Sequence, residues 1–278
     1  MEVTARAPAG PSVRLRHMLS TPRAARITAP LAFLLAWQLL APLIPSRILP
    51  MPVEVVEAMI EQVRDGTLFE SFSVSLGRLA LGFAIALVVG LVLGVAMGMS
   101  PAFEAMLHDF VVVGLTFPYL IWGLLVAMWF GFEGQGPVIV VFIAALPYVM
   151  INASEGVRDV SKDLTDMAAA YDVPRQRVLR HLILPSLSPF FFASLRYGLG
   201  NGWKGLILAE VFAATSGAGH AITEMREYGH FPGVIGFALY FALFSIMVER
   251  MVFGRLSRRV FRWRPSARAV GGPAEGVE

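Results

Sequence analysis

The stretch SLGRLALGFAIALVVGLVLGVAMGM, residues Ser75–Met99, decides the fold. It is longer than the about 20 apolar residues that a helix needs to cross a bilayer. The whole chain has the same character, because 56% of its 278 residues are hydrophobic and only 15% are charged. Soluble domains carry roughly 25% charged residues. Lipid is therefore the expected solvent of this protein.

Five further apolar runs predict an all-α, polytopic membrane protein with six transmembrane helices. The first of these runs, Ile27–Ile44, could be the apolar core of a signal peptide. Pro45, Ser46 and Arg47 follow it in place of a small-residue cleavage site, which favours a retained span. The five runs are Ile27–Ile44, Phe110–Phe130, Pro137–Ile151, Phe190–Phe212 and Val234–Phe253.

The distribution of Lys and Arg predicts the orientation of the chain. These residues are frequent in 1–26, in the loop at about 155–187 and after residue 253, whereas the intervening segments are acidic or neutral. Cytoplasmic loops are enriched in Lys and Arg, so both termini are predicted to be cytoplasmic. This gives a basic N-terminal tail over 1–26, a transmembrane domain over 27–264 and a C-terminal tail over 265–278. Nucleic acid is not an expected partner, although the net charge is +3.

A small residue recurs every fourth position along the second span and predicts a smooth ridge. Small residues let two membrane helices approach closely. Packing within one subunit is favoured over a dimer interface as the partner of this ridge. Its members are Gly82, Ala86, Gly90, Gly94 and Gly98.

Two segments outside the spans have helical periodicity. Pro52–Phe69 alternates apolar and acidic residues and predicts an amphipathic helix lying outside the bilayer. In the long loop, Asp163–Tyr171 and Pro174–Ile183 predict two short helices, with Asp172 in the turn because Asp tolerates left-handed backbone. The second helix has an apolar side and a basic side, which suits docking to a partner, although an ordinary surface loop has the same pattern.

The sequence of this loop resembles the EAA loop of binding-protein-dependent ABC importer permeases. That pattern has E-A-A, then G three residues on, then I-x-L-P; here Asp166 replaces Glu, Met167 the first Ala and Asp172 the Gly. The resemblance implies a type I ABC importer permease fold with a cytoplasmic coupling helix. The residues that it assigns to docking of the ATPase are Asp166, Met167, Ala168, Ala169, Ala170, Asp172, Leu184 and Pro185.

Other stretches look like the nitrate, sulfonate and taurine importer branch of these permeases, from about residue 30 to 264. The third span departs from that branch, because Thr116-Phe-Pro-Tyr119 stands where Pro-Pro-x-Ala is frequent. The stretches that carry the resemblance are LPMPVEV at 49–55, SLGRLALGF at 75–83, MWFG at 128–131, GWKGLILAE at 202–210 and SGAG at 216–219.

The resemblance implies a homodimer in the bacterial cytoplasmic (inner) membrane, seated on a cytoplasmic ABC ATPase dimer and served by an extracytoplasmic solute-binding protein. The sequence contains no G-x-x-x-x-G-K-[ST], so it independently requires an external source of energy. The chain is therefore not expected to be an enzyme or to need a cofactor, and ATP and Mg belong to the partner subunit. The expected substrate is a small anion such as a sulfonate, nitrate or an aromatic acid. An uncharged or cationic vitamin precursor is the alternative.

Five residues within the spans are predicted to line the substrate path. Arg196 and Lys204 share one side of the fifth span, and charges inside a membrane normally face protein or water. They either attract an anion or pair with Glu210, Glu249 or backbone carbonyls. Pro118 breaks the third span, so its aromatic neighbours could form a gate, although simple helix packing also explains them. These neighbours are Phe117, Tyr119 and Trp122.

Other classes of protein are less favoured. A membrane-embedded enzyme would need an acid, a base and a nucleophile at one depth, and no such set is visible. An ion channel or an ATP-independent secondary transporter would be expected to contain an internal repeat with paired broken helices, and no convincing repeat is apparent. The chain has no cysteine and its five histidines lack metal-ligand spacing, so a metal site is not expected.

Overall fold

A computed structural model describes residues 22–46, 48–131 and 135–255, and these residues form helices without strands. The predicted all-α class is confirmed. The expected tails at 1–26 and 265–278 lie outside the described residues, except for 22–26, which begin helix α2. The helices in chain order are α2 (Pro22–Leu40), α3 (Pro52–Arg64), α4 (Thr67–Met99), α5 (Pro101–Thr116), α6 (Tyr119–Phe130), α7 (Gly136–Arg158), α8 (Lys162–Ala170), α9 (Arg175–Val178), α10 (Leu184–Ala213), α11 (Ala218–Glu227) and α12 (Phe231–Met247).

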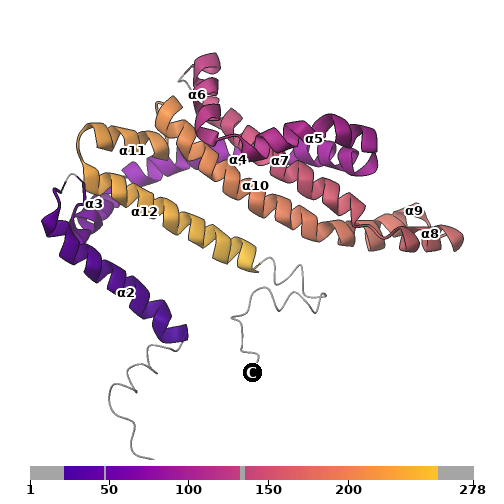
Figure 1. Cartoon of the computed structure of the whole chain (residues 1–278), viewed down its shortest axis with the longest axis horizontal. Coiled ribbons are helices and arrows are strands. Elements are labelled where there is room, and N and C mark those ends of the chain that lie inside the picture. Colours follow the sequence, from indigo (N-terminus) through magenta and orange to yellow (C-terminus); the bar gives the residue numbers. More distant parts are fainter. Residues whose placement is uncertain (1–21, 47, 132–134, 256–278) are drawn as a thin grey trace, which may run out of the picture.

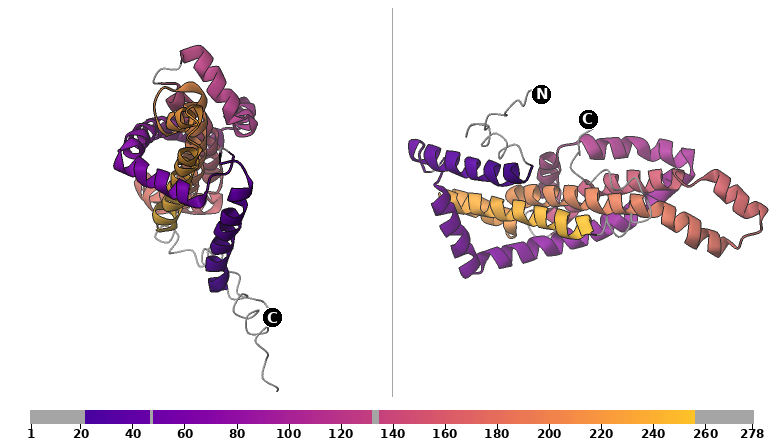
Figure 2. Two further views of the ribbon diagram at one scale, coloured as in Figure 1. Left: turned by 90° about the vertical axis from the view of Figure 1, so that its left-hand side faces the viewer. Right: turned by 90° about the horizontal axis from the view of Figure 1, so that it is seen from below.

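Helices α4, α7 and α10 form the centre of an elongated bundle (Figures 1 and 2). Their contact buries side chains from all three helices, among them Phe83, Val141 and Leu206. Helix α12 packs beside α3 and α11, and α5 packs beside α7. The Phe241 ring of α12 also stacks on the Trp203 indole of α10. Helices α8 and α9 project beyond one end of the bundle. Helix α2 stands apart from the bundle in Figure 1. It is joined to the segment before α3 by a hydrogen bond from the Trp37 indole to the Pro50 carbonyl (3.0 Å).

The number of spans differs from the six expected. Four described helices, counting α9 and α10 as one continuous helix, are long and apolar enough to cross a membrane, and a fifth span results if α5 and α6 count together. The first expected span is a shorter apolar helix, Thr28–Leu43. The expected span Phe110–Phe130 begins earlier, since α5 starts at Pro101, and it is broken as Pro118 indicated, because α6 is bent from α5 by 102°. The bend lies at Pro118, which cannot donate the helical hydrogen bond.

The small-residue ridge of α4 packs against α7 of the same chain, which confirms the favoured interpretation. A Cβ added to Gly82 would meet Val141 Cβ at 2.8 Å, and one added to Gly90 would meet Val149 Cβ at 2.7 Å. At the far end of the ridge, a Cβ on Gly98 would meet Val157 Cβ at 2.6 Å. The helix backbones therefore approach more closely than any larger residue would permit.

Replacing Gly94 by Val should destabilise the protein by about 1–3 kcal/mol, because the new side chain overpacks this contact. Its Cβ would meet the Met150 carbonyl oxygen and, at 2.7 Å, Ala153 Cβ. Gly77→Val is the matched control on the same helix, since nothing lies within 4 Å of a Cβ there. The thermal midpoint of the detergent-solubilised protein measures the difference. Equal losses in both variants would contradict this packing.

Helix α3 is the predicted amphipathic helix, and it ends at Arg64, ahead of a left-handed Gly66 (φ 82°). Its inward side packs against α12. The Gln62 amide donates to the Gly233 carbonyl (3.0 Å), and the Tyr240 hydroxyl donates to the Met59 carbonyl (2.7 Å). Its position outside the bilayer stays a prediction.

Candidate functional site

Residues Ser161 and Asp172 define the start of α8 and the turn between α8 and α9. The Ser161 hydroxyl caps α8 by accepting from the Leu164 amide (3.4 Å). At the other end, the Val173 amide donates to the Ala168 carbonyl (2.9 Å) and the Asp172 amide to the Ala169 carbonyl (3.1 Å), which is a Schellman motif. Asp172 occupies the left-handed position with φ of 50°. The tight turn expected at Asp172 is therefore confirmed.

The second predicted loop helix is not a separate element. Helix α9 continues through a π-helical turn, Leu179–Ile183, directly into α10. The expected break before the fifth span is therefore wrong, and α10 begins at Leu184 instead of Phe190. Pro185 does not end this continuous helix, and the π-helical turn Leu179–Ile183 lies directly before α10, in which Pro185 is the second residue.

A groove of about 790 Å³ separates α8 from α9 and the π-helical turn. Ala169 and Asp172 line it together with Val178 and Leu179. The other residues expected to dock an ATPase do not line the groove. Asp166, Met167, Ala168 and Ala170 lie elsewhere on α8, and Leu184 and Pro185 lie at the start of α10.

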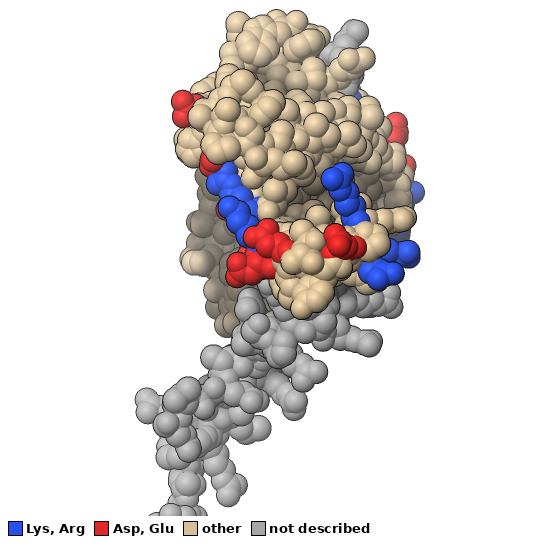
Figure 3. Space-filling model, turned by 90° about the vertical axis from the view of Figure 1, so that its right-hand side faces the viewer, with Lys and Arg blue, Asp and Glu red and all other residues tan. Residues whose placement is uncertain are grey.

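No residue of α8, α9 or the π-helical turn is buried within the described chain. Met167 is 54% exposed and Leu184 is also 54% exposed. Figure 3 views this end of the molecule and shows acidic and basic side chains gathered on the projecting part, beside uncharged ones. The hairpin thus offers apolar and charged groups to a partner rather than to its own bundle.

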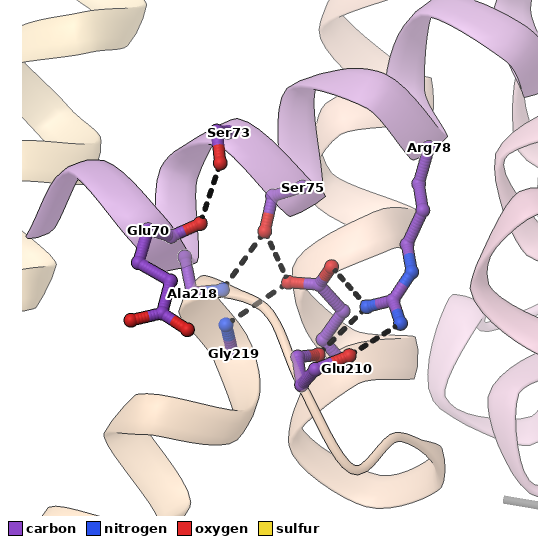
Figure 4. A network of polar contacts seen from close by, with 8 residues as sticks. Glu70, Ser73, Ser75, Arg78, Glu210, Ala218 and Gly219 are labelled. Atoms are coloured by element: carbon purple, nitrogen blue, oxygen red, sulfur yellow. Dashed lines mark hydrogen bonds and ion pairs between the residues drawn. The ribbon is translucent and has the colours of Figure 1, made fainter. Parts of the chain in front are cut away.

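A buried ionic network lies near the opposite end of the bundle (Figure 4). The Glu210 carboxylate, fully buried on α10, accepts hydrogen bonds from Arg78 (2.9 Å) and Ser75 (2.7 Å) of α4. It also accepts from the Gly219 amide (3.0 Å). The Arg78 guanidinium donates further to the carbonyl of Ser216 (2.7 Å). One carboxylate thereby joins α4, α10 and the start of α11.

Sequence reasoning missed this pair and considered Glu210 only as a partner of cations on its own helix. The pair could have been expected from the presence of Arg78 in the second span, because a charge there needs a partner, together with the glycine-rich SGAG at 216–219. Gly217 has φ of 101°, and a side chain there would strike the Glu210 carboxylate. A Cβ on Gly219 would meet Glu210 Cβ at 2.5 Å. These glycines allow the loop to close over the carboxylate.

The two cations of α10 have different surroundings. Arg196 forms a bidentate ion pair with Glu249, in which its Nε donates to Glu249 Oε2 (3.2 Å). Of the two roles considered for Arg196, attracting an anion or forming an ion pair, the structure shows the ion pair. Lys204 has no ion pair within the described residues, and its side chain is exposed. Arg196, Lys204 and Glu249 line one cavity of about 300 Å³.

The aromatic residues at the break between α5 and α6 form a separate group. The rings of Phe117 and Trp122 lie with centroids 5.0 Å apart. The Tyr119 hydroxyl donates to Asn201 Oδ1 (3.1 Å) on α10 and lies 3.4 Å from the Tyr148 hydroxyl on α7. Asn201 does not line the cavity with Lys204. The five predicted path residues thus fall on different sides of α10.

A bundle of long apolar helices with a helical hairpin projecting from one end defines a multi-pass membrane protein. The chain belongs to the family of binding-protein-dependent transport system inner membrane components, which matches residues 69–262. It is thus an ABC permease with the type I permease domain, and the resemblance found in its sequence is confirmed.

Three relatives illustrate the branch of the family. The SsuC protein of Escherichia coli (strain K12), named for transport of aliphatic sulfonates, is 32% identical, over 85% of this chain and 90% of its own. The taurine transport system permease protein TauC of the same strain is 29% identical, over 81% of this chain and 82% of its own. The nitrate import permease protein NrtB of Synechococcus elongatus is 28% identical, over 83% of this chain and 88% of its own.

Proposed function

We propose that this chain is the permease subunit of an ATP-driven ABC importer and forms the translocation path as a homodimer. The observation that carries the proposal is the α8–α9 hairpin, which projects from the bundle without burying any residue. A short apolar and charged helix pair that is ordered but unpartnered fits the surface of a cytoplasmic ATPase. An ATPase dimer supplies hydrolysis, since the chain has no phosphate-binding loop of its own.

The orientation follows from the hairpin. If α8 and α9 contact a cytoplasmic ATPase, the end of the bundle with Glu210 and α11 faces outward, where an extracytoplasmic solute-binding protein delivers the substrate. We also propose that both termini lie in the cytoplasm, on the basis of the distribution of basic residues. ATP and Mg are bound by the partner subunit, and lipid surrounds the dimer.

The proposed substrate is a small organic or inorganic anion. Relatives named for sulfonate, taurine and nitrate transport support this class. Lys204 and Arg196 are proposed to line the path, since charges within a span face water or protein. Lys204, which has no ion pair among the described residues, is proposed to attract the anion. Phe117, Tyr119 and Trp122 are proposed to form a gate where α5 bends into α6.

Reconstitution tests the importer function. The full chain should purify from detergent as a dimer with two copies of an ATPase, and proteoliposomes of this complex should accumulate anion only with ATP and an added solute-binding protein. A non-hydrolysable ATP analogue should abolish uptake. Uptake driven by an ion gradient alone, without ATP, would favour a secondary transporter and contradict the proposal.

A further inference from the structure

We propose that the cavity between α10 and α12 holds the transported solute and selects an organic monoanion with an apolar tail of a few carbons. The inference rests on the importer function proposed above and adds a step of selection within the permease itself. The cavity of about 300 Å³ is lined by residues of α4, α10, α12 and the π-helical turn Val248–Phe253.

The charge of the cavity suits one negative group. Arg196 and Glu249 neutralise each other, and their side chains are 46% and 47% exposed. Lys204 adds one positive charge that no described carboxylate balances. At 1.5 Å per residue, Lys204 lies about 14 Å along α10 from its end at Ala213. With that end at the surface of a hydrocarbon layer about 30 Å thick, Lys204 lies well inside the layer. Exposed charges at this depth face water, a solute or a second copy of the chain, because lipid would not solvate them.

The walls of the cavity suit an apolar tail. The indole of Trp203 stacks on the Phe241 ring, with centroids 4.7 Å apart and planes 7° apart. Phe244 packs against the same indole with a centroid distance of 4.7 Å, and Leu79 and Leu199 complete the apolar lining. One liquid water occupies about 30 Å³. A bare nitrate ion would leave most of this cavity unfilled, whereas an alkyl or aryl tail would bury its apolar walls.

Direct binding to the full chain in phosphatidylcholine nanodiscs tests the proposal without ATPase or binding protein. The probes are nitrate, methanesulfonate, butanesulfonate and hexanesulfonate, titrated by calorimetry. The affinity should rise about fourfold for each added methylene, because burying one CH₂ group favours binding by that factor. The rise should stop once the tail fills the cavity. Nitrate should bind most weakly.

Two substitutions separate the charge from the walls. Lys204→Gln should weaken binding of every anion by at least about tenfold, because a hydrogen bond to a charged group is lost, and Lys204→Arg should restore it. Gly200→Leu should reduce the gain with tail length more strongly than it weakens methanesulfonate binding, since its side chain takes up part of the cavity. A Cβ at Gly200 meets nothing within 4 Å, so the fold tolerates it. Gly77→Leu, equally unobstructed on α4, is the control and should bind as the wild type does.

Three results would overturn the proposal: no binding by the wild type, equal affinity across the series, or unchanged binding by Lys204→Gln and Gly200→Leu. Retention of the tail-length gain in Gly200→Leu would place the tail in the lipid instead of the cavity. None of these results bears on ATP-dependent uptake by the reconstituted complex. The failure of the selection site and the failure of the importer function are thus observed in separate experiments.

Discussion

Glu210→Ala should prevent accumulation of folded permease, or lower its stability by about 3–5 kcal/mol, because it leaves a buried cation unpaired. Arg78 is only 11% exposed and has its single ion pair with Glu210 among the described residues. The Gly219 amide also loses its acceptor. Since native proteins are stable by about 5–15 kcal/mol, this loss is a large fraction of the total. Yield and thermal midpoint of the solubilised protein measure it.

Glu224→Ala is the matched control for Glu210→Ala, because Glu224 is an exposed carboxylate on the neighbouring helix α11. The double variant Arg78→Met with Glu210→Met should be more stable than either single Met variant, since it removes both charges together. A midpoint for Glu210→Ala equal to that of Glu224→Ala would show that the network contributes nothing. The network also fixes the loop before α11, so the intact pair is expected to hold this end of the bundle in shape.

Asp166→Arg and Ala170→Trp should each reduce ATP-dependent uptake by at least about tenfold while the protein stays folded in the membrane. Both positions are exposed on α8, so stability should change by no more than about 0.5 kcal/mol. A disrupted position at the centre of a protein interface costs about 2 kcal/mol or more of binding. Uptake, thermal midpoint and the amount of ATPase retained on purification are measured in parallel.

Glu227→Arg controls for the reversal of charge, because Glu227 is exposed on α11 at the opposite end. Asp172 offers a second comparison. Its φ of 50° suits Gly, so Asp172→Gly should keep uptake, whereas the β-branched Asp172→Val should lose it. Normal uptake with normal assembly in both Asp166→Arg and Ala170→Trp would rule out the hairpin as the docking element.

Features that depend on neighbours along the chain could be predicted from the sequence. The apolar runs predicted the spans, and the four-residue repeat from Gly82 to Gly98 predicted the smooth face of α4 that packs on α7. Pro118 predicted a break, and Asp172 predicted a left-handed turn. Hydropathy, helical periodicity and turn chemistry are local properties, so a short stretch of sequence is enough to predict features that depend on them.

The sequence determined the class of protein, its helical character and the turn at Asp172, and tertiary structure decided which charges meet. Arg78 and Glu210 are 132 residues apart, and they pair only because α4 and α10 pack with these faces together. The same packing joins Arg196 to Glu249 across 53 residues and leaves Lys204 without an ion pair in the described chain. Helix rotation and crossing are set by the interlocking of all side chains at once, so no local pattern contains them.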